Sequence, residues 1–218
     1  LLSSLILAFV FSYIRTQDNQ PYLTAWSAAW VLHALRFACC LLGHTGLFPS
    51  ACEIASETFS VSSGYLLLAG SFIFLGRRVP VYWTVFAGAA LVWVFITVPA
   101  GVGAFAVTLP AYIFIAAAHF LSGIMFLRSV RLNAAGKYLV GITFILWGFH
   151  FLDYPFASEH PQTLPMGYLL GSLFKLSLII GILLLYFYQA RTEIAREREE
   201  LSFFVRNASD LIVSIAPD

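Results

Sequence analysis

The sequence predicts an all-α membrane protein with seven transmembrane helices, the last of which continues into a charged cytoplasmic helix. Hydrophobic residues make up 60% of the 218 residues and charged residues 11%, and the mean hydropathy is +0.85. A soluble domain is about one quarter charged, so a chain of this composition needs lipid around much of its surface. Ten of the charged residues lie after residue 190, which divides an apolar part from a polar tail.

Seven apolar segments are long enough, or nearly long enough, to cross a bilayer, which takes about 20 mostly apolar residues. Turn-forming residues such as Asp, Gly and Pro, or arginines, separate them. The segments are 1–14, 22–43, 54–75, 80–99, 104–127, 136–153 and 165–189. The first residue is Leu1 rather than Met, and the sequence stops at Asp218 in the middle of a sequence pattern. We therefore expect a fragment of a longer protein.

Basic residues in the connections between these segments predict the topology. All the lysines and arginines of the six connections follow the first, third and fifth segments. They are Arg15, Arg77, Arg78, Arg128, Arg131 and Lys137. Cytoplasmic loops carry this excess, so we expect the N-terminus outside and the C-terminus in the cytoplasm, in a multi-pass protein of the bacterial inner membrane. The net charge of +1 argues against a nucleic-acid partner.

The polar tail begins with a helical pattern over 190–205. From Phe187, positions at alternating spacings of three and four are mostly apolar, and charged residues lie between them. This pattern is typical of a coiled coil and predicts a homodimer, with Ile194, Leu201 and Phe204 as signal-transmission residues. A solvated helix with an accidental stripe is the alternative.

The last residues, 206–218, resemble the opening of a PAS domain. Residues 207–210 have turn chemistry, Leu211, Val213 and Ile215 alternate as in a strand, and Pro217-Asp218 resembles the start of a hairpin turn. Another α+β domain is the alternative. The expected organisation is therefore a sensor domain over 1–189, a linker helix over 190–205 and the start of a PAS domain over 206–218.

The membrane part resembles the multi-span sensory input modules that precede PAS domains in bacterial histidine kinases and diguanylate cyclases. The resemblance rests on the stretches 75–80 and 150–156 and on Gly167-Tyr168 and Gly171. It implies a receptor whose effector lies outside this chain, preferably a histidine kinase that uses ATP and a response regulator, or alternatively a diguanylate cyclase or phosphodiesterase. The chain itself has no catalytic motif.

Ionisable residues inside predicted spans are costly and mark candidate functional sites. With a rise of about 1.5 Å per residue, six of them fall near the midplane or in the outer half of the bilayer. These candidate ligand-binding residues are His33, Arg36, Glu57, His150, Asp153 and Lys175. They predict a cavity, open to the outer side, for a small molecule, an ion or a lipid-like ligand. The alternative is an ion-pair network that joins the helices.

We predict no cofactor in this chain. The histidines of the spans lie on separate segments without the paired spacing of metal ligands. We therefore favour His33 and His119 with hydrogen-bond partners inside the bundle over histidines that bind haem or a metal. Lys175 in a seventh span suggests a retinal Schiff base, but no Asp stands four residues before it.

Two further alternatives stay open. Cys39, Cys40 and Cys52 lie at the outer ends of two neighbouring spans, where a Cys40–Cys52 disulfide and free thiols are both plausible. A transporter with a regulatory tail is the competing class of protein, although the two halves show no internal repeat of the kind transporters use.

Overall fold

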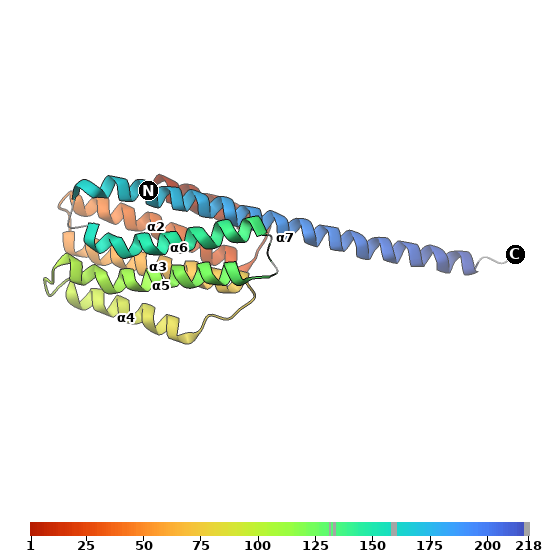
Figure 1. Ribbon diagram of the computed structural model, residues 1–218, viewed down its shortest axis with the longest axis horizontal. Helices are drawn as coiled ribbons and strands as arrows, with labels where there is room; N and C mark the ends of the chain where they lie inside the picture. The colour runs from red at the N-terminus through yellow and green to blue at the C-terminus, as the bar shows by residue number, and fades with distance from the viewer. Residues whose placement is uncertain (131, 133, 158–160, 216–218) are drawn as a thin grey trace.

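The computed structural model describes residues 1–130, 132, 134–157 and 161–215, and every regular element within these residues is helical. The helices are α1 (Leu2–Gln17), α2 (Pro21–His44), α3 (Pro49–Phe74), α4 (Val81–Thr97), α5 (Ala104–Arg128), α6 (Ala134–Ala157), the short 3-10 helix η1 (Pro161–Thr163) and α7 (Leu164–Ile215). Figure 1 shows a bundle of roughly parallel and antiparallel helices, from which the second half of α7 projects alone.

Each predicted segment coincides with one α-helix, so the prediction of helix number and order is confirmed for the described residues. Four helices, α2, α5, α6 and α7, are long and apolar enough to cross a membrane, and α1 and α4 are shorter apolar helices. α3 has sufficient length, but Glu57 and several serines lower its mean hydropathy. The coarse prediction of an all-helical membrane protein is therefore supported.

Proline and glycine set several helix boundaries. Pro21 and Pro49 occupy the first turns of α2 and α3, where the missing N–H costs no hydrogen bond. Gly76, two residues after α3, and Gly101, four residues after α4, have positive φ angles of 68°, a conformation that glycine adopts without a steric penalty. These residues explain why the breaks are readable from the sequence.

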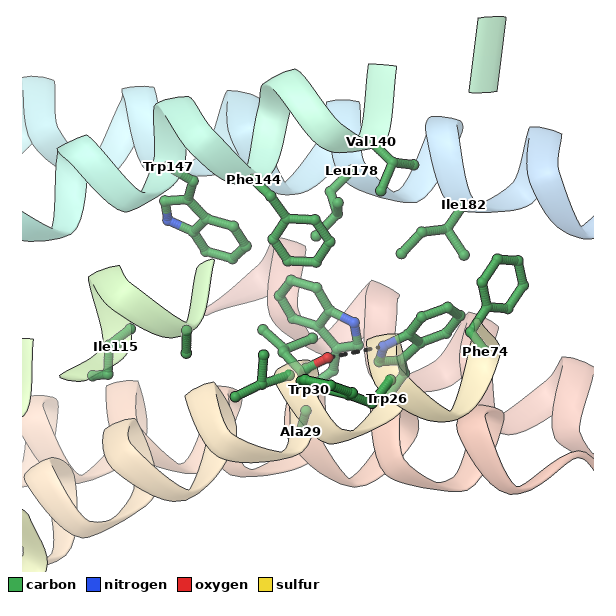
Figure 2. Packing of buried hydrophobic residues seen from close by; sticks show 14 of the residues in the cluster. Trp26, Ala29, Trp30, Phe74, Ile115, Val140, Phe144, Trp147, Leu178 and Ile182 are labelled. Atoms are coloured by element: carbon green, nitrogen blue, oxygen red, sulfur yellow. Dashed lines mark hydrogen bonds between the residues drawn. The ribbon is translucent and has the colours of Figure 1, made fainter. Parts of the chain in front are cut away.

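The core of the bundle is aromatic. α2 packs along α1 and α3, α5 along α3 and α6, and α7 along α6, while α4 packs against α3 and α5 at the side. Trp26 and Trp30 of α2 are fully buried, and Trp147 of α6 is 2% exposed. Figure 2 shows these three rings between the helices, with the Trp26 Nε1 donating to the Leu67 carbonyl at 3.3 Å.

The strand predicted at Leu211–Ile215 is wrong, because α7 stays helical through Ile215. A strand satisfies its backbone groups only through a neighbouring strand, whereas a helix satisfies them within its own segment. Residues 206–215 extend the helical pattern of the tail, and the described residues contain no strand of a PAS domain. Residues 216–218, and Arg131 of the predicted basic connections, lie outside the described residues.

Candidate functional site

A cavity of about 440 Å³ lies at the end of the bundle where α6 is followed by η1 and α7. Side chains from α2, α5, α6, η1 and α7 line it. Five of the six candidate residues are among them: His33, Arg36, His150, Asp153 and Lys175. The sixth, Glu57 of α3, is buried but does not line the cavity. The volume falls within the range of about 300–1,000 Å³ that is usual for small-molecule sites.

Aromatic rings hold the Arg36 guanidinium in the wall of the cavity. Arg36 is 5% exposed and donates a hydrogen bond from Nη2 to the Tyr112 hydroxyl. Its Cζ lies 5.3 Å from the ring centroids of Phe37 and Tyr154 and 5.7 Å from that of Tyr112, distances typical of cation–π contacts. Tyr112 and Tyr154 are themselves stacked, with centroids 4.6 Å apart. The charge is thus surrounded by ring faces, and its Nε has no hydrogen-bond partner.

Lys175 of α7 brings a second cation to the same wall. Its side chain is 4% exposed, its Nζ lies 3.5 Å from the Ser4 Oγ of α1, and the same Nζ is 4.7 Å from the Phe37 ring centroid. Phe37 therefore contacts both Arg36 and Lys175. Two cations and one ring form a compact cationic cluster contributed by α2 and α7.

The alternative to a ligand cavity was an ion-pair network that joins the helices, and no ion pair joins two helices among the described residues. Within the part of the chain described here, only His150–Asp153 and Arg196–Glu200 form ion pairs closer than 4.0 Å. Glu57 is 6% exposed and its Oε2 has no hydrogen-bond partner. The buried cations of the cavity are therefore not neutralised by direct contact with a carboxylate.

His150 and Asp153 lie at the more open side of the cavity. The His150 Nδ1 is 3.3 Å from the Asp153 carboxylate, whose side chain is 59% exposed. Gly167 and Gly171 of α7 face the His150 ring, and a Cβ at Gly171 would come within 3.4 Å of its Nε2. Small residues on α7 therefore leave room for this histidine beside the helix.

His119 packs against the aromatic core of the bundle. It is one of the two histidines, with His33, that we expected to find partners within the bundle. Its Nδ1 lies 2.7 Å from the Ile115 carbonyl, and its ring contacts Trp147 and Phe151 at centroid distances of 4.9 and 4.8 Å. His33 likewise contacts Trp147 and Phe37 edge-on. In the described part of the chain, no group of three or more His, Cys, Asp or Glu residues is arranged to hold a metal ion.

The three cysteines are unpaired. The Cys40 Sγ lies 3.2 Å from the Ser56 Oγ, and the Cys52 thiol donates to the Leu47 carbonyl at 3.4 Å. Hydrogen bonds to oxygen, rather than the alternative Cys40–Cys52 disulfide, occupy both thiols.

The signal-transmission candidates lie far from the cavity. Ile194, Leu201 and Phe204 are on the projecting part of α7 and are 52%, 65% and 68% exposed. They share one helix with Lys175.

The aromatic part of the site was not predicted from the sequence. Phe37 directly follows Arg36, and Tyr154 directly follows Asp153, so adjacency to a candidate charge was a usable signal for both. Tyr112 has no such neighbour, because its contact with Arg36 joins two helices that are distant in the sequence.

Comparison with known proteins supplies no family for this chain. No protein-family model, no curated protein and no solved structure matches it. The cavity and the helix that leaves the bundle are therefore the features of this chain that bear on its function.

Proposed function

We propose that this chain is the sensory part of a membrane receptor. In this proposal seven helices cross the bacterial inner membrane with the N-terminus outside, and the cavity binds a small ligand from the outer half of the bilayer. A homodimeric α7 relays binding to a cytoplasmic effector, preferably a histidine kinase that acts with a response regulator. A diguanylate cyclase or phosphodiesterase is the alternative effector.

One observation carries the proposal: α7, one of the helices that line the cavity, is also the helix that leaves the bundle. α7 contributes Met166, Tyr168 and Lys175 to the cavity wall and continues without interruption to Ile215. A ligand shifts a conformational equilibrium when it binds one state more tightly than another. A ligand that contacts α7 directly can therefore change the position of its projecting part without any intermediate element.

Exposed apolar side chains on the projecting part support dimerisation. Ile194, Leu201 and Phe204 are separated by seven and three residues and are all more than half exposed. Such residues are buried in the interface of a parallel coiled coil. Nearby charges, including the Arg196–Glu200 pair at 3.0 Å, belong to the polar face. A second copy of this chain is the partner that fits this stripe.

The test fuses the catalytic core of a histidine kinase to the C-terminal end of this chain, after Asp218. Autophosphorylation of the fusion protein in nanodiscs is the readout. Lys175→Met should change the autophosphorylation rate several-fold, because it removes a cation that α7 contributes to the cavity. Leu176→Ala is the matched control, since Leu176 is the next residue and is 46% exposed. Equal rates for both variants and the unmodified fusion would refute coupling through α7.

A second variant examines transmission separately from the cavity. Ile194→Asp combined with Leu201→Asp should abolish regulated output, because two charges would enter the dimer interface, while thermal unfolding of the bundle should be unchanged. Regulated output in a monomeric double variant would overturn the proposal. Solute flux through liposomes containing the chain would instead identify a transporter.

A further inference from the structure

We propose that the ligand of this cavity is an organic acid, with its carboxylate between Arg36 and Lys175 and a compact aromatic or aliphatic body against the aromatic wall. This inference rests on the proposed receptor function, because it names the ligand class of that same cavity.

The charges that face the cavity favour an anion. Arg36 and Lys175 are both at least nine-tenths buried, and no described carboxylate approaches either within 4.0 Å. Among the described lining residues Asp153 supplies the one carboxylate, and it is exposed and paired with His150. A buried cation without a counter-ion is costly, so an anion that enters the cavity is strongly stabilised.

The described residues do not fill the hydrogen-bonding capacity of either cation. Among these residues the Arg36 Nε has no partner, and the Lys175 Nζ has only the long 3.5 Å contact with the Ser4 Oγ. Arginine presents a planar fork that matches a carboxylate, and lysine adds a point charge. Both cations contact Phe37 and both line the cavity, so their positive potentials add within the same part of the cavity.

The apolar part of the cavity wall favours a ligand with an apolar body. Trp147, Phe151 and Leu170 line the cavity together with Phe37 and the stacked tyrosines. A volume of about 440 Å³ is much larger than a lone inorganic anion needs. Apolar rings gain free energy when they bury the apolar part of a ligand. The site is therefore complementary to an amphiphilic acid rather than to chloride or phosphate.

The experiment measures binding of matched probes to the full chain purified in detergent. The probes are 3-phenylpropionate, its neutral amide 3-phenylpropanamide, and the cation 3-phenylpropylamine, with isothermal titration calorimetry as the readout. We expect saturable binding of the acid, about tenfold or more tighter than of the amide, because a hydrogen bond to a charged group is the stronger. The amine should show no saturable binding.

Variants locate the acid group. Lys175→Met and Arg36→Gln should each weaken 3-phenylpropionate binding about tenfold and leave the weak binding of the amide unchanged. Lys175→Arg keeps the charge and should retain the preference for the acid, which maintains the test if Lys175→Met fails to fold. Arg77→Ala, on the connection after α3, is the control and should leave the affinity unchanged.

The outcomes separate this inference from the receptor proposal. Equal affinity for acid and amide, tighter binding of the amine, or no saturable binding of any acid would overturn the assignment of an organic acid. None of these results affects coupling through α7 in the kinase fusion. An acid that binds as expected but leaves the output of the fusion unchanged would overturn the receptor proposal alone.

Discussion

Trp30 of α2 and Trp147 of α6 stack with their ring centroids 5.8 Å apart and their planes at 10°. Trp30 is fully buried, and Trp147 also lines the cavity. The stack therefore joins the aromatic core of the bundle to the wall of the candidate site. The packing of the core and the shape of the cavity wall therefore depend on the same side chain.

Trp147→Ala should destabilise the protein by about 3–5 kcal/mol, because it removes a large buried ring and leaves a void. Phe149→Ala, on the same helix, should cost clearly less, since Phe149 is 60% exposed. Unfolding in mixed detergent micelles measures both free energies. Equal losses for the two variants would contradict the burial of Trp147.

Two glycine substitutions should change stability in opposite directions. A Cβ at Gly123 of α5 would lie 2.6 Å from the Gly141 carbonyl oxygen of α6, whereas a Cβ at Gly88 of α4 meets no atom within 4 Å. Gly123→Ala should cost about 1–3 kcal/mol through overpacking. Gly88→Ala should stabilise α4 by up to about 1 kcal/mol. Thermal unfolding that moves the same way for both variants would argue against the close approach of α5 and α6.

Glu57→Gln should tighten binding of 3-phenylpropionate several-fold. Glu57 is a buried carboxylate that attracts Arg36 electrostatically without forming a direct ion pair, so its neutralisation leaves more positive potential for the ligand. Glu53→Gln, at an exposed position of α3, is the control and should have little effect. Calorimetric titration compares the two. Weaker binding in Glu57→Gln than in Glu53→Gln would show that Glu57 supports the site instead.

Disulfide cross-linking tests the dimer interface. In a background with all three native cysteines replaced by Ser, Ile194→Cys and Leu201→Cys should cross-link rapidly in membranes, because equivalent interface positions of a parallel coiled coil face each other. Glu199→Cys, on the polar face, should react slowly. Non-reducing gel electrophoresis distinguishes the species. Similar rates at all three positions would indicate random collision rather than a defined interface.

Helix positions were predictable because composition and length decide them. Each apolar segment is bounded by residues that end helices, such as Gly76 and Gly101, or begin them, such as Pro21. The strand at Leu211–Ile215 was mispredicted from its alternating pattern. Alternation indicates a strand only where another strand is present to accept its hydrogen bonds.

The charged part of the site was predictable, and the aromatic part was not. Depth along a helix follows from the rise per residue, which placed Arg36 and Lys175 at matching heights. Rotation about the helix axis and the choice of neighbouring helix do not follow from depth. Glu57 therefore has a suitable depth but lies outside the cavity lining, and Tyr112 was missed although it is a direct partner of Arg36.

The continuity of α7 has a mechanical consequence. From Lys175 to Ile215 the helix is about 60 Å long at 1.5 Å per residue. It is packed in the bundle through Leu185 and continues beyond the bundle as a single projecting arm (Figure 1). A tilt of about 5° at Lys175 would move the far end by about 5 Å, a displacement as large as one helical turn. The same tilt moves the packed residues up to Leu185 much less than it moves Ile215, because displacement grows with distance from Lys175.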